Sequence, residues 1–170
     1  MRYAFCLFKY FPFGGIQRDG YRIAETLKDR GHSVRFYALS WEGDVPPWVE
    51  FIQVPVKAVS RHSLYSRFQD WVQHDLRRAP VDLVFGLNKM VGLDAYFAGD
   101  SCFEEKARTQ RGWWYRQMPR YRFFASTEQA VFRRLGATEV LTISDLQTPL
   151  FQRYYRTPVS YTHLTLPTKA

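Results

Sequence analysis

Two consecutive glycines, Gly14 and Gly15, separate an apolar run at residues 3–8 from a segment whose apolar residues recur at helical spacing. Glycine lets the backbone approach a ligand closely, and the N-terminus of a helix offers N–H groups and the positive end of a dipole to an anion. The pair therefore fits a site for a pyrophosphate group. An ordinary turn explains the spacing equally well, and the G-x-G-x-x-G fingerprint of dinucleotide-binding proteins is absent.

Further polar side chains stand at the ends of the expected elements. Asp19 falls in the first turn expected of the helix, where an acid complements the helix dipole. Asp100 follows a buried strand at its carboxyl end, the edge at which open α/β sheets bind ligands, although it can equally cap the next helix. Asn88 and Lys89 follow another strand end and fit contacts to hydroxyl or phosphate groups, or a solvated loop.

Residues 103–134, the basic–aromatic segment, carry eight basic but only three acidic residues, interleaved with aromatic ones. Arginine beside aromatic rings favours the headgroup region of a bilayer, and anionic lipid attracts each nearby cation by about 1 kcal/mol. An ordinary basic face is the alternative, and Trp114, Met118, Tyr121 and Ala125 share a helical face, which predicts that part of the segment is core. Pro119 suits the first turn of a helix. The residues predicted at a membrane interface are Lys106, Arg111, Trp113, Trp114, Arg116, Arg120 and Arg122.

Apolar runs that alternate with helical patterns position these side chains. Such alternation predicts an α/β fold, a Rossmann-like parallel sheet flanked by helices. The expected strands are residues 3–8, 33–39, 49–56, 81–86, 93–98 and 139–143, and the expected helices are 16–27, 64–76 and 144–155, the last capped by Ser144 and Asp145.

The composition suits one domain of 170 residues, and 46% hydrophobic content excludes a disordered chain. A formal charge of +8 indicates an anionic partner, either a nucleic acid, a membrane surface or a phosphorylated substrate. No run approaches the roughly 20 apolar residues of a membrane span, and no signal peptide is recognisable. Cys6 and Cys102 form no metal-binding or redox motif, which favours a reducing cytoplasm.

From Met1 to about Thr157 the sequence resembles the lipopolysaccharide core glucosyltransferases of glycosyltransferase family 4. The segments that carry this resemblance are residues 4–19, 40–44, 52–57, 88–90 and 92–100. The resemblance implies a GT-B fold, in which two Rossmann-like domains face each other across a cleft. Residues 1–157 would then be the N-terminal, acceptor-side domain, and the C-terminal donor domain, with its basic residues and paired glutamates, is missing. The chain alone should be inactive.

The resemblance also implies a reaction. Glucose would pass from UDP-glucose to an inner-core heptose of lipopolysaccharide, with retention of anomeric configuration and without a metal or another cofactor. Gly14 and Gly15 would hold the pyrophosphate. Asp19 would bind acceptor hydroxyls or help to accept the proton of the attacking hydroxyl, and Asp100 would replace a histidine that contacts the transferred sugar in related enzymes. The remaining residues implied near the substrates are Gln17, Arg18, Asn88 and Lys89.

A lipid-anchored acceptor implies where the enzyme works. We expect it in the cytoplasm, bound peripherally to the anionic inner face of the inner membrane, with no nucleic acid as partner. Three alternatives stay open. They are a family 4 transferase for another donor or acceptor, a non-catalytic module that binds membrane or nucleic acid, and a free-standing acceptor binder.

Residues 158–170 differ from the rest of the chain. They include an uncharged, threonine-rich stretch at 159–168 that resembles the translation of a sequencing adapter. We therefore predict a non-native tail, in which His163 carries no function. A natural threonine-rich loop is the alternative.

Overall fold

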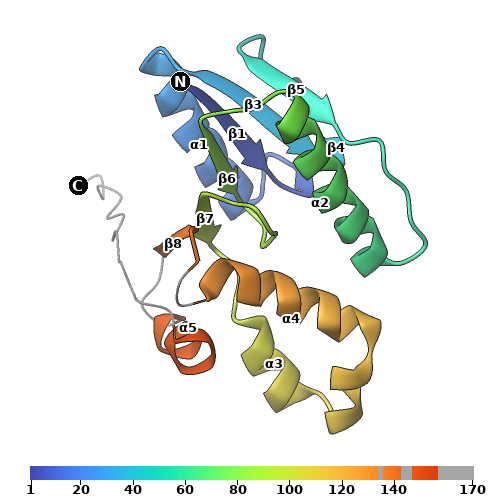
Figure 1. Cartoon of the computed structure of the whole chain (residues 1–170). Helices are drawn as coiled ribbons and strands as arrows, with labels where there is room; N and C mark the ends of the chain where they lie inside the picture. Colours follow the sequence, from blue (N-terminus) through green and yellow to red (C-terminus); the bar gives the residue numbers. More distant parts are fainter. Residues whose placement is uncertain (134–135, 143–146, 157–170) are drawn as a thin grey trace.

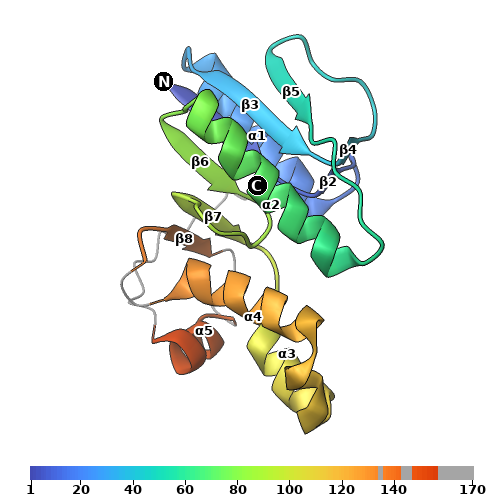
Figure 2. The ribbon, with the colours of Figure 1, turned by 45° about the vertical axis from the view of Figure 1, so that its right-hand side comes forward.

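A computed structural model describes residues 1–133, 136–142 and 147–156 of the chain. Its centre is a parallel sheet with the strand order β5-β3-β1-β6-β7-β8 (Figures 1 and 2). The expected α/β fold with a parallel sheet flanked by helices is confirmed. The strands are β1 (Arg2–Cys6), β3 (Ser33–Ala38), β5 (Val49–Gln53), β6 (Leu83–Gly86), β7 (Ala95–Ala98) and β8 (Glu139–Thr142).

Strands β6 and β7 are apolar throughout, and β1 is apolar after Arg2, because both faces of the sheet are covered. In β1, Phe5 pairs with Phe36 of β3 on one side and with Phe85 of β6 on the other. The Phe5 and Phe36 rings stack with centroids 5.0 Å apart. The continuous apolar runs of the sequence are therefore the strands that lie inside the molecule.

Two helices cover opposite faces of the sheet. Helix α1 (Gly15–Asp29) buries Ala24 against the face that carries Phe5 and Phe36. Helix α2 (Arg61–Arg78) buries Phe68 and Val72 in the other core, and Figure 2 shows it in front of the sheet. Ser60 caps α2 by accepting the N–H of Ser63.

The basic–aromatic segment folds as α3 (Phe103–Gln110), the 3-10 helix η1 (Trp113–Gln117) and α4 (Pro119–Phe132). Pro119 is the first residue of α4, as its type predicts. The far end of α4 packs on the sheet through Phe132, whose ring meets Tyr96 of β7 edge-on and stacks on Phe151 of α5 (Thr148–Tyr155). In Figure 1, α3 and the yellow-orange η1 that follows it lie below the sheet.

Several boundaries differ from the expectation. The strand predicted at 49–56 ends at Gln53, and a small parallel pair of β2 (Lys9–Tyr10) and β4 (Ser40–Trp41) was not expected. Two-residue strands are too short to leave a pattern. The predicted cap at Ser144 and Asp145 and the tail at 158–170 lie outside the described residues.

Candidate functional site

A hollow of about 290 Å³ lies beside the carboxyl ends of β6 and β7. We call it the edge hollow. It brings together four residues that the sequence singles out from separate segments, Asn88, Lys89, Asp100 and Lys106. The full lining is Phe8, Tyr65, Asn88, Lys89, Asp100, Ser101, Phe103, Lys106, Phe124 and Thr127.

Aromatic rings form much of the wall. Phe8, which follows β1, stacks face to face on Tyr65 of α2, with centroids 3.6 Å apart. Asn88 fixes this arrangement, because its Oδ1 accepts the N–H of Phe8 at 2.8 Å. The loops after β1 and β6 are thus tied together at the rim.

Asp100 is exposed and lines the edge hollow. It does not cap α3, so that alternative is wrong. The N-cap position belongs to Cys102, and the first N–H groups of α3 donate to Glu128 instead. Among the described residues, no hydrogen bond or ion pair engages the Asp100 carboxylate, which leaves it available to a ligand.

Lys89 is held by the protein itself. Its Nζ donates to Oε2 of Glu128 at 2.5 Å and to the carbonyl of Ser101 at 2.8 Å, and its side chain is 11% exposed. Lys89 therefore lines the edge hollow as one half of a buried ion pair, with its charge already neutralised.

Glu128 of α4 is the residue that sequence reasoning missed. It is completely buried and accepts the N–H groups of Phe103 and Glu104 at 2.7 and 3.0 Å, and the Tyr155 hydroxyl at 2.6 Å. Burial alone would raise the pKa of its carboxyl group, but Lys89 and the other donors lower it below its ordinary value. The one available signal was an isolated acid within the basic–aromatic segment.

The N-terminus of α1 forms a second group of predicted residues, none of which lines the edge hollow. Gly14 is the N-cap and Gly15 the first helical residue. A Cβ on Gly15 would meet no atom within 4 Å, so the space beside Gly15 is open, whereas a Cβ on Gly14 would meet the Gln17 side chain and, at 2.7 Å, the Phe11 ring. Gln17 Nε2 donates to the carbonyl of Lys9 at 3.4 Å, and Arg18 is exposed.

Asp19 was expected in the first turn of α1, and this is wrong. The helix begins at Gly15, so no acidic residue stands in its first turn. Asp19 is half-buried in the second turn, and none of the hydrogen bonds or ion pairs among the described residues involves it. Asp19 therefore does not stand in the first turn, where an acid would complement the helix dipole.

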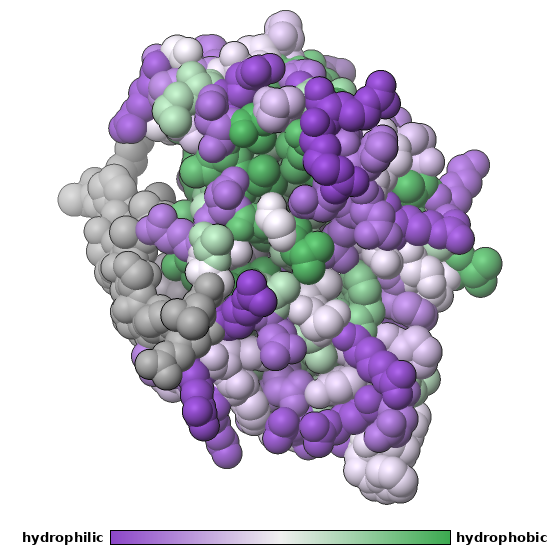
Figure 3. All heavy atoms as spheres, in the orientation of Figure 1, coloured by the Kyte–Doolittle hydropathy of each residue, from purple (hydrophilic) through white to green (hydrophobic). Residues whose placement is uncertain are grey.

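The exposed part of the basic–aromatic segment surrounds η1. Trp113 is 82% and Trp114 59% exposed, and Met118 is exposed as well. Of the four residues expected to share a helical face, Tyr121 and Ala125 are half-buried, so only the part of this face that lies further along α4 is covered. In Figure 3, green atoms gather where the sheet lies between α1 and α2, whereas the surface over α3, η1 and α4 is mostly purple and pale. Exposed cations of this surface are Lys106, Arg111, Arg116, Arg120 and Arg122.

Three of these arginines lie over aromatic rings. Arg111 is 5.6 Å from the ring centre of Tyr115, Arg116 is 5.9 Å from that of Tyr121, and Arg120 is 5.8 Å from that of Phe124. Such cation–π pairs hold charge next to apolar surface. Within the described residues, no helix is both long and apolar enough to cross a membrane.

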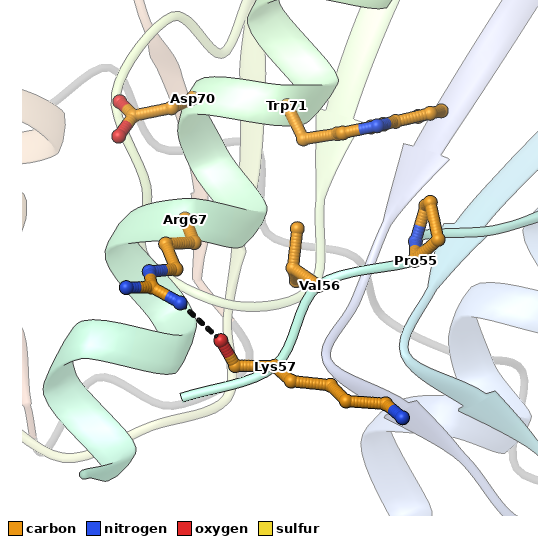
Figure 4. A pocket seen from close by; sticks show the side chains of 6 residues that line it. All are labelled: Pro55, Val56, Lys57, Arg67, Asp70 and Trp71. Atoms are coloured by element: carbon orange, nitrogen blue, oxygen red, sulfur yellow. Dashed lines mark hydrogen bonds between the residues drawn. The ribbon is translucent and has the colours of Figure 1, made fainter. Parts of the chain in front are cut away.

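A further hollow of about 460 Å³ lies between α2 and the chain after β5. Figure 4 shows Trp71 above Val56 and Pro55 to its right, with Arg67 donating to the carbonyl of Lys57. It contains none of the residues predicted to bind substrate. Among residues 1–133, 136–142 and 147–156, no group of three His, Cys, Asp or Glu side chains is placed to hold a metal ion.

Known proteins were compared with the chain in sequence and in fold. No protein-family model matches the chain. Over 154 residues, 91% of its length, the chain is 49% identical to the lipopolysaccharide glucosyltransferase WaaG of Escherichia coli (strain K12), of which it spans 41%. It also superposes on a crystal structure of WaaG, described as a glycosyltransferase involved in lipopolysaccharide biosynthesis. The TM-score is 0.91 at 48% identity, covering 95% of this chain and 44% of that one.

The chain thus spans less than half the length of the curated relative that it matches. Identity of this level across nearly the whole chain, together with the shared sheet, confirms the resemblance that the sequence predicts. In sequence and in fold, the chain is similar to a part of the lipopolysaccharide glucosyltransferase WaaG.

Proposed function

We propose that the protein carrying this chain is a retaining glucosyltransferase that moves glucose from UDP-glucose to an inner-core heptose of lipopolysaccharide. The observation that carries the proposal is the 49% identity to a lipopolysaccharide glucosyltransferase over 91% of this chain. The chain supplies the acceptor side, and a donor domain of the same kind of fold completes the enzyme. The proposal includes no metal ion and no cofactor besides the donor.

The edge hollow is the proposed acceptor site. Sugar hydroxyls both donate and accept hydrogen bonds, and the free carboxylate of Asp100 and the amide of Asn88 offer both functions. The rings of Phe8 and Tyr65 supply an apolar wall for the C–H face of a pyranose. Because Lys89 and Glu128 neutralise each other, the site suits an uncharged sugar.

The N-terminus of α1 is the proposed place of the donor pyrophosphate. The first N–H groups of a helix have no acceptor within the helix, and the open space beside Gly15 lets an anion approach them. Asp19, one turn further on and without a partner among the described residues, binds acceptor hydroxyls or helps to accept the proton of the attacking hydroxyl.

The test uses a chimera in which residues 1–156 replace the matching part of E. coli WaaG. We expect the chimera to transfer labelled glucose from UDP-glucose to lipopolysaccharide that ends at its inner core, and to do so in the presence of EDTA. Transfer of another hexose in preference to glucose, or dependence on an added divalent cation, would refute the corresponding part of the proposal. A chimera that folds and binds UDP-glucose but transfers nothing would refute the function.

We further propose that the surface around η1 docks on the anionic inner face of the inner membrane, in the cytoplasm. The exposed Trp113 and Trp114 amid five exposed cations favour a charged bilayer surface. The triple variant Arg111→Gln, Arg116→Gln, Arg120→Gln should lose sedimentation with anionic vesicles. A matched triple variant at Arg22, Arg30 and Arg77 should keep it. Equal loss in both, or equal binding to neutral vesicles, contradicts docking by this surface.

A further inference from the structure

A second hollow adjoins the edge hollow and shares one wall with it. It has a volume of about 350 Å³ and is called here the basic hollow. Tyr65 lines both hollows, and in the edge hollow its ring stacks on Phe8. The lining of the basic hollow is Lys9, Ala58, Val59, Ser60, Arg61, Leu64 and Tyr65.

The two hollows differ in charge. In the edge hollow, Lys89 is neutralised by Glu128, and the lining holds one further cation, Lys106, and one carboxylate, Asp100. The basic hollow contains the cations Lys9 and Arg61 and no acidic side chain. Both cations are exposed, and neither side chain forms an ion pair or a hydrogen bond among the described residues. Its charge is therefore uncompensated until a ligand brings an anion.

Besides the two cations and Ser60, the basic hollow is lined by side chains with apolar surface. Val59 is fully exposed, although apolar side chains of this size gain free energy when they are covered. Ala58, Leu64 and the ring of Tyr65 complete this wall. Two free cations next to an apolar wall suit a ligand that carries an anionic group on a saccharide ring, whose C–H face packs on the wall.

We propose that the basic hollow binds an anionic substituent, a phosphate or a carboxylate, on the sugar next to the one that is glucosylated. This inference rests on the proposed function, because it takes the edge hollow as the acceptor site. The acceptor then lies across Tyr65, with its neutral reacting sugar beside Asp100 and its acidic neighbour beside Lys9 and Arg61. The charge of the acceptor sets the direction in which it lies.

The experiment compares two acceptors in the chimera, one oligosaccharide with its acidic groups and the same oligosaccharide after phosphatase treatment and reduction of its carboxyl groups. Arg61→Ala and Lys9→Ala should each raise KM for the acidic acceptor about tenfold to a hundredfold, the cost of losing a hydrogen bond to a charged group. Neither should change kcat, nor KM for the neutralised acceptor. Arg77→Ala, which removes the same charge at the other end of α2, is the matched control.

Each outcome decides one part of the inference. Equal changes of KM for both acceptors, or unchanged KM in Arg61→Ala and Lys9→Ala, would overturn the anionic subsite while transfer itself persists. Absence of transfer in the unmodified chimera would refute the proposed function instead. Inorganic phosphate, added as competitor, distinguishes the sources of the anion. It should compete only weakly, since it lacks the saccharide that covers Val59. Inhibition that equals that of the acidic oligosaccharide would show a site for free phosphate.

Discussion

Glu128 is the residue on which the candidate site depends most. Its buried carboxylate joins the loop after β6 through Lys89, the start of α3 through Phe103, and α5 through Tyr155. A buried carboxylate persists only when it is paired and hydrogen-bonded. These bonds position Asp100 and Ser101, which lie between the joined segments.

Replacing Glu128 by Gln should destabilise the fold. The substitution leaves the buried Lys89 without its counter-charge, which typically costs about 3–5 kcal/mol. The measurement is urea unfolding at neutral pH, with the exposed Glu25→Gln on α1 as control. Equal stability of Glu128→Gln and the wild type would show that the network contributes nothing.

The same pair of proteins tests the titration of Glu128. Because the folded pKa of its carboxyl lies below the ordinary value, the carboxylate stabilises the fold fully above the pKa of an unfolded glutamate, about 4.3. This contribution is lost as the pH falls through the folded pKa. The difference in free energy of unfolding between wild type and Glu128→Gln should therefore shrink below about pH 4. A constant difference down to the acid transition contradicts the lowered pKa.

The two cysteines should be unreactive in the folded protein. Burial raises the pKa of the Cys6 thiol to about 12, and burial together with Glu128 raises that of Cys102 to about 12. Thiolate is the reactive form, so Ellman's reagent should label neither thiol at pH 8 and both after denaturation. Rapid labelling of the native protein would show that one of these cores opens readily.

At the N-terminus of α1, one substitution can test the stability of the fold and the activity of the enzyme separately. Gly15→Ala places a methyl group in open space at the first position of a helix. Stability should hold or rise, by up to about 1 kcal/mol, because alanine restricts the unfolded chain. If the donor pyrophosphate occupies that space, kcat/KM in the chimera should fall at least about tenfold, since small displacements at a reacting centre are costly. Unchanged kcat/KM would remove this helix end from donor binding.

Some of these elements and site residues could be predicted from the sequence, and others could not. Continuous apolar runs predicted β1, β6 and β7 because these strands are covered on both faces. Because parallel strands end at the same edge of a sheet, Asn88 and Asp100, which follow two of them, could be predicted at one edge. The isolated acid Glu128 gave no sign of its partners, because it accepts the first N–H groups of a helix that begins 25 residues earlier in the chain. The sequence did not show which part of the basic–aromatic segment is covered. Trp114 and Met118 are exposed whereas Tyr121 and Ala125 are half-buried, because helical spacing does not hold through η1 and the break before Pro119.

In the molecule as a whole, the proposed binding sites lie at one edge of the sheet. The start of α1, the edge hollow and the basic hollow all follow strands β1, β5, β6 and β7 at their carboxyl ends. The surface around η1 lies beyond this edge, on α3, η1 and α4 (Figure 1). If the proposed docking through η1 holds, it places the proposed acceptor site close to the membrane surface.

Glucose transfer by the chimera that carries Asp100→Ala tests most directly whether the edge hollow is the acceptor site. Asp100 is exposed and has no partner among the described residues, so its removal should leave the circular dichroism spectrum and the melting temperature unchanged. We predict that kcat/KM falls about a hundredfold or more, the usual effect of losing a positioned acid–base or hydroxyl-binding group. A folded Asp100→Ala chimera with near-normal turnover would contradict the assignment of the edge hollow as the acceptor site.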